Sequence, residues 1–216
     1  MAASRLPSDL GGTRLGVPVD REEHDRAEWE VLTDGVLRAV RAKGLWRWDE
    51  GRRATEDLGQ EYYDRLGYYQ RRVLAMETLM VERGMVTVEE LNERSEQLPR
   101  PPVPDHRVPV EHDLSAEATT PAFRTGQRVR IADRWPAGHV RTPAYVRGKQ
   151  GRVVGVHGPF RNPETLAYRG SGLPARWLYT VEFFQSGVWD DYDGSPADVV
   201  VMDIYEQWIE PLEVAR

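Results

Sequence analysis

The sequence predicts an α+β protein in which a helical N-terminal half precedes a small antiparallel β-barrel. Apolar residues recur every three or four positions over residues 22–97, the period of amphipathic helices. After residue 123 the apolar runs are short and bounded by glycine, proline or aspartate, which is typical of strands. We therefore expect four segments: an extended N-terminal arm (1–21), a helical domain (22–97), a proline-rich linker (98–122) and the barrel (123–216).

The arm is rich in glycine and proline and has few periodic apolar positions. This composition favours an extended segment over a helix. A disordered terminus would have the same composition, so residues alone leave both interpretations open.

The first long helix is expected from about residue 22 to 42. Its apolar face would contain Trp29, Leu32, Val36 and Val40, and Gly44 would end it. A tight aromatic turn over residues 45–49 then leads into a short helical segment. Asp49 is a suitable N-cap for that segment.

A second long helix is expected from about residue 55 to 83, ending at Gly84. The pair Thr87 and Glu90 has the spacing of a capping box, which would open a further short helix to about residue 96. The apolar stripe of the long helix consists of Tyr62, Leu66, Tyr69, Val73, Met76 and Met80. Such a stripe is more typical of a core or an interface than of a cofactor site.

Four strands are expected in the C-terminal part. They cover residues 129–131, 151–156, 178–183 and 199–204. The aspartates at 190–193 lack the spacing of a calcium loop, so they indicate an acidic turn. His106 and His112 lie among carboxylates in the proline-rich linker, where solvated side chains are more common than metal ligands.

Charge and composition exclude several functional classes. The net charge of −6 and the pI near 5.5 argue against a nucleic-acid-binding surface. Because the chain has no cysteine, it can supply neither a disulfide nor a thiolate metal ligand. No apolar run approaches the roughly 20 residues that cross a bilayer, and no signal-peptide core is present, so we expect a cytoplasmic protein.

Motifs along nearly the whole chain resemble the β subunit of nitrile hydratase. They include Asp9-Leu10-Gly11-Gly12, Trp48-Asp49-x-x-Arg52, Gly138-His139-x-Arg141-x-Pro-x-Tyr145-x-Arg147-Gly148, Leu178-Tyr179-Thr180-Val181 and Asp203-Ile204-Tyr205-Glu206. The resemblance implies that the C-terminal domain is an SH3-like barrel and that the arm wraps a partner subunit. It also implies hydration of a nitrile to an amide by a heterodimer or heterotetramer with an α-type subunit.

The resemblance further implies that the partner holds a trivalent cobalt or iron, bound by cysteines of which two are oxidised. This chain would supply no cofactor and no metal ligand. The family's two catalytic β-subunit arginines match Arg52 and Arg141, whose guanidinium forks would hold the oxidised sulfur oxygens. Without the motifs, either arginine would be interpreted as an ordinary surface charge.

The substrate pocket implied by the resemblance includes Trp48, Tyr68, Tyr69 and Arg72. Tyrosine hydroxyls there would orient substrate or relay a proton. Many relatives have histidine and tryptophan where this chain has Arg71 and Arg72, and cations at those positions favour an anionic or strongly polar substrate. Arg147 is less strongly indicated, and His139 is equally consistent with a structural or a catalytic role.

Two alternatives to a nitrile hydratase remain. A thiocyanate hydrolase-like subunit would act on an anion, which agrees with the arginine pair, although the single fused chain argues against it. A non-catalytic protein that recruits or assembles a metalloenzyme would tolerate replacement of Arg52 and Arg141.

Overall fold

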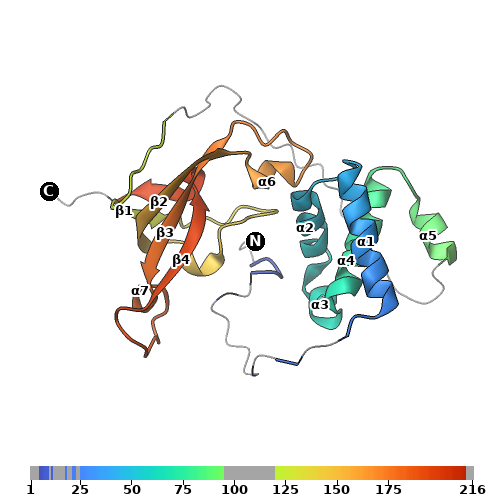
Figure 1. The fold of residues 1–216 in the computed structure, drawn as a ribbon, viewed down its shortest axis with the longest axis horizontal. Coiled ribbons are helices and arrows are strands. Elements are labelled where there is room, and N and C mark those ends of the chain that lie inside the picture. The colour runs from blue at the N-terminus through green and yellow to red at the C-terminus, as the bar shows by residue number, and fades with distance from the viewer. Residues whose placement is uncertain are drawn as a thin grey trace.

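The computed structural model describes residues 5–9, 11, 18, 21–22, 25–94 and 120–212. Within them it shows helices in the N-terminal half and one five-stranded antiparallel sheet in the C-terminal part (Figure 1). The α+β fold class is confirmed. The predicted linker lies mostly outside the described residues, as does most of the predicted arm, and the domain boundaries therefore stay a prediction.

The N-terminal half contains five helices among the described residues. They are α1 (Glu28–Ala42), α2 (Trp48–Glu56), α3 (Gly59–Arg65), α4 (Tyr68–Glu82) and α5 (Val88–Arg94). The first begins at Glu28, later than the predicted start near residue 22, but it ends where it was predicted, because Gly44 follows it with a φ of 68°. The capping box is also confirmed, since the Glu90 N–H donates to Thr87 Oγ1 at 3.1 Å and the Thr87 N–H donates to Glu90 Oε2 at 2.8 Å.

The prediction of one long helix over residues 55–83 is wrong. Gly59 opens α3 with a φ of 79°, and Leu66 is extended, with φ −100° and ψ 141°. Gly67 then begins α4, and its N–H donates to Gln70 Oε1 at 2.8 Å. The predicted range therefore contains the end of α2 and the two separate helices α3 and α4.

Asp49 is not the N-cap of the helix that carries Arg52. Helix α2 begins one residue earlier, at Trp48, and Arg47 is its N-cap. The backbone N–H of Arg47 donates to Glu50 Oε2 at 2.9 Å. The Glu50 side chain thus provides an acceptor for the N–H of the N-cap residue, which has no partner within the helix. Asp49 is thereby free to face the neighbouring cavity from the first turn.

The helical part packs around α4. Its buried core consists of Trp46, Ala54, Ala75 and Leu79, with Met76 and Met80 of the predicted stripe packed against it. In the described part of the chain, no helix is long and apolar enough to cross a membrane.

The sheet has the strand order β4-β3-β2-β1-β5. Its strands are β1 (Arg128–Ile131), β2 (Gln150–Phe160), β3 (Arg176–Phe184), β4 (Val199–Tyr205) and β5 (Ile209–Pro211). The short elements η1 (Ala144–Val146), α6 (Pro163–Leu166), α7 (Gln185–Val188) and η2 (Glu206–Trp208) connect them. The four predicted strands are all present, whereas β5 was missed because three residues ending in proline carry little strand signal.

The buried core of the C-terminal part is built from alternate residues of these strands. Fully buried strand residues include Val129, Ile131, Val153 and Tyr179, and Trp208 of η2 is buried as well. In the hydrogen-bonded order, β4 and β5 lie at the two edges of the sheet. The closed barrel therefore stays a prediction.

Polar contacts join the two parts along α2 and α6, which lie next to each other in Figure 1. The Arg53 Nε donates to the Ala167 carbonyl at 3.0 Å, and Arg47 Nη1 donates to the Gly170 carbonyl at 2.6 Å. Arg169 Nη2 donates to the Glu82 carbonyl at 2.7 Å. This seam between α2 and α6 fixes the position of Arg52 relative to the sheet.

Candidate functional site

Two cavities meet at the seam and share Arg52 and Arg141 in their walls. The large cavity, of about 580 Å³, is lined by α2, the strands and the segment around α6. The small cavity, of about 210 Å³, is lined by α2, α4 and the start of the chain. Both predicted catalytic arginines therefore stand between the two openings.

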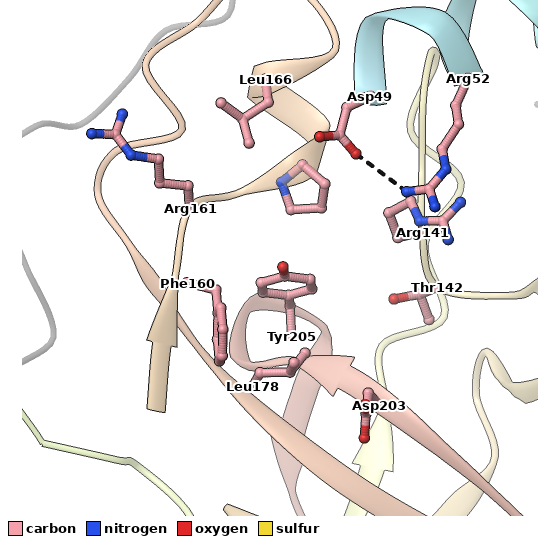
Figure 2. Close-up of a pocket in the computed structure, with 11 residues that line it drawn as sticks. Asp49, Arg52, Arg141, Thr142, Phe160, Arg161, Leu166, Leu178, Asp203 and Tyr205 are labelled. Carbon is pink, nitrogen blue, oxygen red and sulfur yellow. Dashed lines mark ion pairs between the residues drawn. The ribbon is translucent and has the colours of Figure 1, made fainter. Parts of the chain in front are cut away.

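Figure 2 shows the large cavity with the guanidinium groups of Arg52 and Arg141 beside each other. Arg52 descends from α2, and Arg141 comes from the loop that precedes η1. Arg52 Nη1 lies 3.6 Å from Asp49 Oδ1. No carboxylate among the described residues forms an ion pair with Arg141, so its charge is free for a ligand that approaches the cavity.

The surroundings act on the charge of Arg141. Partial burial in the cavity wall lowers the pKa of Arg141, and the positive charge of Arg52 lowers it further. Much of the Arg141 side chain nevertheless remains open to solvent in the isolated chain, and a guanidinium keeps its proton at neutral pH. Two like charges are thus held together, which favours an anion between them.

Tyr205, at the end of β4, points its hydroxyl into the large cavity (Figure 2). Burial raises the pKa of Tyr205, and the charge of Asp49 adds to the increase. The hydroxyl therefore stays protonated at neutral pH and is available as a hydrogen-bond donor.

A buried pair of side chains holds the Arg141 loop against α2. His139 Nδ1 and Glu56 Oε2 are 2.7 Å apart, and both residues are buried. Ser8 Oγ donates to the other oxygen of Glu56 at 2.9 Å. Because Glu56 lies one helical turn after Arg52, the same turn of α2 positions both arginines.

The loop also requires a glycine and a tyrosine. The His139 N–H donates to the Tyr168 hydroxyl at 2.9 Å. Gly138 has a φ of 91°, and a Cβ atom there would collide with that hydroxyl. The sequence Gly138-His139 thus allows the loop to pass close to Tyr168, and Arg141 follows on the same loop.

The structure brings four of the six predicted site residues to one place. Arg52, Arg141, Tyr68 and Arg72 line the small cavity. Arg72 Nη2 donates to the Tyr68 hydroxyl at 3.1 Å, which orients both side chains.

Trp48 and Tyr69 line neither cavity. The guanidinium carbon of Arg41 lies 3.2 Å from the centroid of the Trp48 ring, and the Trp48 side chain is largely exposed. The Tyr69 ring packs edge-on against Trp29 and Tyr68, with centroid distances of 6.3 Å and 5.1 Å. A direct role for either residue in substrate binding stays a prediction.

The guanidinium group of Arg147 packs against two tryptophan rings. Its guanidinium carbon lies 4.6 Å from the Trp135 ring centroid and 5.2 Å from that of Trp208. Its Nη2 donates to the Thr142 carbonyl at 2.8 Å. The hydrogen bond holds the backbone of Thr142, the residue that follows Arg141.

Glu56 and Tyr205 are site residues that the sequence interpretation missed. Glu56 lies four positions after Arg52, and a helix brings such residues to one face, so the spacing was an available signal. Tyr205 belongs to the Asp203-Ile204-Tyr205-Glu206 motif, yet nothing local in that motif indicates which side chain enters a cavity.

The polar groups at the two cavities are mainly guanidinium groups and hydroxyls, which suit an anion rather than a cation. Among the described residues, no group of three or more histidine, cysteine, aspartate and glutamate side chains could hold a metal ion.

Comparisons with known proteins extend these observations. The family profile described as "Nitrile hydratase beta subunit, N-terminal" matches residues 5–119, and the one described as "Nitrile hydratase beta subunit, C-terminal" matches residues 111–211. The nitrile hydratase subunit beta of Rhodococcus erythropolis is 34% identical over 190 residues, covering 86% of this chain and 85% of that one.

Two further relatives differ in their described activity. The cobalt-containing nitrile hydratase subunit beta of Pseudonocardia thermophila is 30% identical over 224 residues, or 94% of each chain. The thiocyanate hydrolase subunit beta of Thiobacillus thioparus is 32% identical over 94 residues, which cover 43% of this chain and 59% of that subunit.

Proposed function

This chain belongs to the nitrile hydratase β-subunit family, and from that membership we propose that it is one subunit of a heteromeric hydro-lyase. The enzyme would convert a nitrile and water to an amide. An α-type partner would complete the complex as a heterodimer or heterotetramer. The nitrile hydratase subunits among the relatives support this activity, and two of them are cobalt-containing.

One observation carries the proposal: Arg52 and Arg141 come from distant parts of the chain and meet in the wall shared by both cavities. Arg141 has no ion-pair partner among the described residues. A guanidinium fork can donate two hydrogen bonds to one anionic group, so the pair is suited to the oxygens of oxidised cysteine ligands on the partner.

The partner's cobalt or iron would act as the Lewis acid that polarises the nitrile. The residues of this chain would work around that centre. Arg52 and Arg141 would fix the anionic sulfur oxygens, which keeps the ligands correctly oriented. Tyr68 and Tyr205 would present their hydroxyls to the small and the large cavity, and these hydroxyls would hydrogen-bond the substrate or its attacking water.

The C-terminal domain is part of the same proposal, as an SH3-like barrel. In the observed order, the last strand, β5, pairs with the first, β1. Pairing between the first and the last strand is a feature expected of a five-stranded sheet that closes into a barrel.

The test is to coexpress the chain with an α-type partner and metal, and to assay the complex with Arg52→Gln and Arg141→Gln. We expect each variant to assemble and to lose about 10–100-fold in nitrile turnover, the range typical of groups that orient metal ligands. Arg38→Gln is the matched control, since Arg38 is exposed and lies away from both cavities, where it pairs with Asp34 at 2.9 Å.

Full turnover by both assembled variants would contradict the proposal. It would favour a non-catalytic assembly or binding protein instead. Metal content and subunit ratio, measured on the same samples, separate loss of chemistry from loss of the complex.

A second candidate function is that of a thiocyanate hydrolase-like subunit. The likeness to the Thiobacillus thioparus subunit and the arginine-lined small cavity favour it. Thiocyanate consumption by the same complex, followed through ammonia release, distinguishes the two: this candidate requires thiocyanate turnover without nitrile hydration.

A further inference from the structure

The small cavity contains more arginines than the two that we propose bind the partner's oxidised cysteine ligands. Four arginines line it: Arg52, Arg71, Arg72 and Arg141. The one carboxylate in its wall is Glu56, whose oxygens bond His139 and Ser8. Glu56 is therefore already engaged away from the arginines of α4, and the cavity is strongly cationic.

Arg71 and Arg72 are held in place by tyrosines rather than by carboxylates. Arg71 Nη1 donates to the Tyr63 carbonyl at 3.2 Å, and its guanidinium carbon lies 4.1 Å from the Tyr63 ring centroid. Arg72 is bonded to the Tyr68 hydroxyl, and its guanidinium carbon lies 5.1 Å from that ring centroid. Neither arginine forms an ion pair with a carboxylate of the described residues.

A further cation lies close to Arg72. Burial lowers the pKa of Arg41, and the charge of Arg72 lowers it further. The two cations would repel each other less with an anion nearby. The arrangement thus orients Arg72 while leaving its charge without compensation.

The shape and chemistry of the cavity fit a small organic anion. A volume of about 210 Å³ accommodates a chain of a few carbon atoms, and the rings of Tyr63 and Tyr68 provide apolar walls. Arg71 and Arg72 come from α4, whereas Arg52 and Arg141 come from α2 and the loop before η1. Two separate cation pairs suit a ligand whose charged end is distinct from its reacting end.

We propose that Arg71 and Arg72 form a carboxylate subsite and that the preferred substrate is a nitrile bearing a carboxylate at the far end of a short chain. This inference rests on the proposed hydratase function. Thiocyanate, in which the charge resides on the reacting group itself, would leave the second cation pair unused.

The test compares 4-cyanobutanoate with its uncharged analogue 4-cyanobutanamide on the metal-loaded complex. We expect a kcat/KM ratio that favours the carboxylate by about tenfold or more, since hydrogen bonds to charged groups are worth about that much. Arg71→Gln and Arg72→Gln should remove most of this preference, because the KM for the carboxylate should rise more than the KM for the uncharged analogue.

Arg65→Gln is the matched control, because Arg65 is exposed and pairs with Glu61 at 3.0 Å. Arg72→Lys, which keeps the charge but loses the fork, should retain part of the preference. Added salt should reduce the preference in the natural complex. Turnover of the uncharged amide shows that each variant is folded and assembled.

Equal or greater efficiency with the amide in the natural complex would overturn the carboxylate subsite and leave the hydratase function intact. So would variants that keep the full preference. Absence of turnover with both nitriles would overturn the hydratase function itself, and thiocyanate consumption in that case would support the second candidate.

Discussion

At the scale of single residues, Glu164 shows how the fold sets the ionisation of a carboxyl near the site. It lies in the first turn of α6, and Trp208 Nε1 donates to its Oε1 at 2.5 Å. Burial raises the pKa of Glu164, although this hydrogen bond and the charges of Arg134, His139 and Arg147 oppose the increase. The folded state therefore binds the proton of Glu164 more tightly than the unfolded chain does.

This raised pKa predicts a pH-dependent effect of Glu164→Gln. The stabilising contribution of the protonated carboxyl is present below the unfolded pKa and is lost as the pH rises through the higher folded pKa. The variant carries no such group. We therefore expect its melting temperature to rise relative to that of the natural protein as the pH increases from about 4, the usual range of glutamate, to neutrality.

Thermal unfolding followed by circular dichroism at several pH values measures this difference. Glu61→Gln is the control, because Glu61 is exposed and its pair with Arg65 should contribute little. A difference between variant and natural protein that does not change with pH would show that Glu164 titrates normally in the fold.

At the scale of elements, the loop that leads to Arg141 depends on Gly138. We expect Gly138→Ala to lower the free energy of unfolding by about 1–3 kcal/mol, the usual cost of a strained backbone position. Turnover should fall as well, because Arg141 lies three residues later on the same loop. Gly35→Ala provides the contrast: Gly35 lies inside α1, and no atom lies within 4 Å of the place that a Cβ atom would take, so alanine should stabilise by about 0.5–1 kcal/mol.

Chemical denaturation and the nitrile assay test both glycine variants. Equal stability changes for the two would mean that the approach of Tyr168 to the loop imposes no constraint. A stability loss for Gly138→Ala with unchanged turnover would mean that the position of Arg141 does not depend on the loop's conformation.

The elements that the sequence predicted well are those with local signals. Gly44, Gly84 and the Thr87–Glu90 box each mark a helix end through backbone or side-chain chemistry within a few residues. The interruptions at Gly59 and Gly67 were missed because the apolar stripe continues through them at helical spacing. Periodicity reports which residues face the core, and it is insensitive to a bend between successive turns.

At the scale of the whole molecule, Arg53 joins the helical part to the sheet. It is 3% exposed, and it pairs with Asp57 Oδ2 at 2.9 Å and with Glu82 Oε2 at 2.7 Å. Its Nε also bonds the Ala167 carbonyl beyond α6. One buried side chain thus connects α2, α4 and the segment after α6.

Replacement of this buried cation should be costly. We expect Arg53→Met to lower the free energy of unfolding by about 3–5 kcal/mol, because it removes the buried cation that pairs with Asp57 and Glu82. Arg38→Met, at an exposed pair, should change it by less than about 1 kcal/mol. Chemical denaturation measures both, and a loss below about 1 kcal/mol for Arg53→Met would show that the seam is held by other contacts.

The candidate site was predictable in part. The resemblance of short motifs to the family singled out Arg52 and Arg141, whose catalytic role stays a prediction. Their meeting, and the role of Glu56 and His139 in holding them, depend on the packing of α2 against a loop far away in sequence. No local pattern encodes such a contact, and it becomes visible only once the two parts are placed together.

The seam between α2 and α6 has a consequence for the pairing of Arg52 with Arg141 when subunits associate. Arg52 is presented by the helical part and Arg141 by the loop next to the sheet, so a chain with only one part folded offers a single guanidinium. A partner whose oxidised cysteine ligands bind both guanidinium groups would therefore require a subunit in which both parts are folded. The contacts at the seam therefore decide whether the two guanidinium groups can act on one anionic group at all.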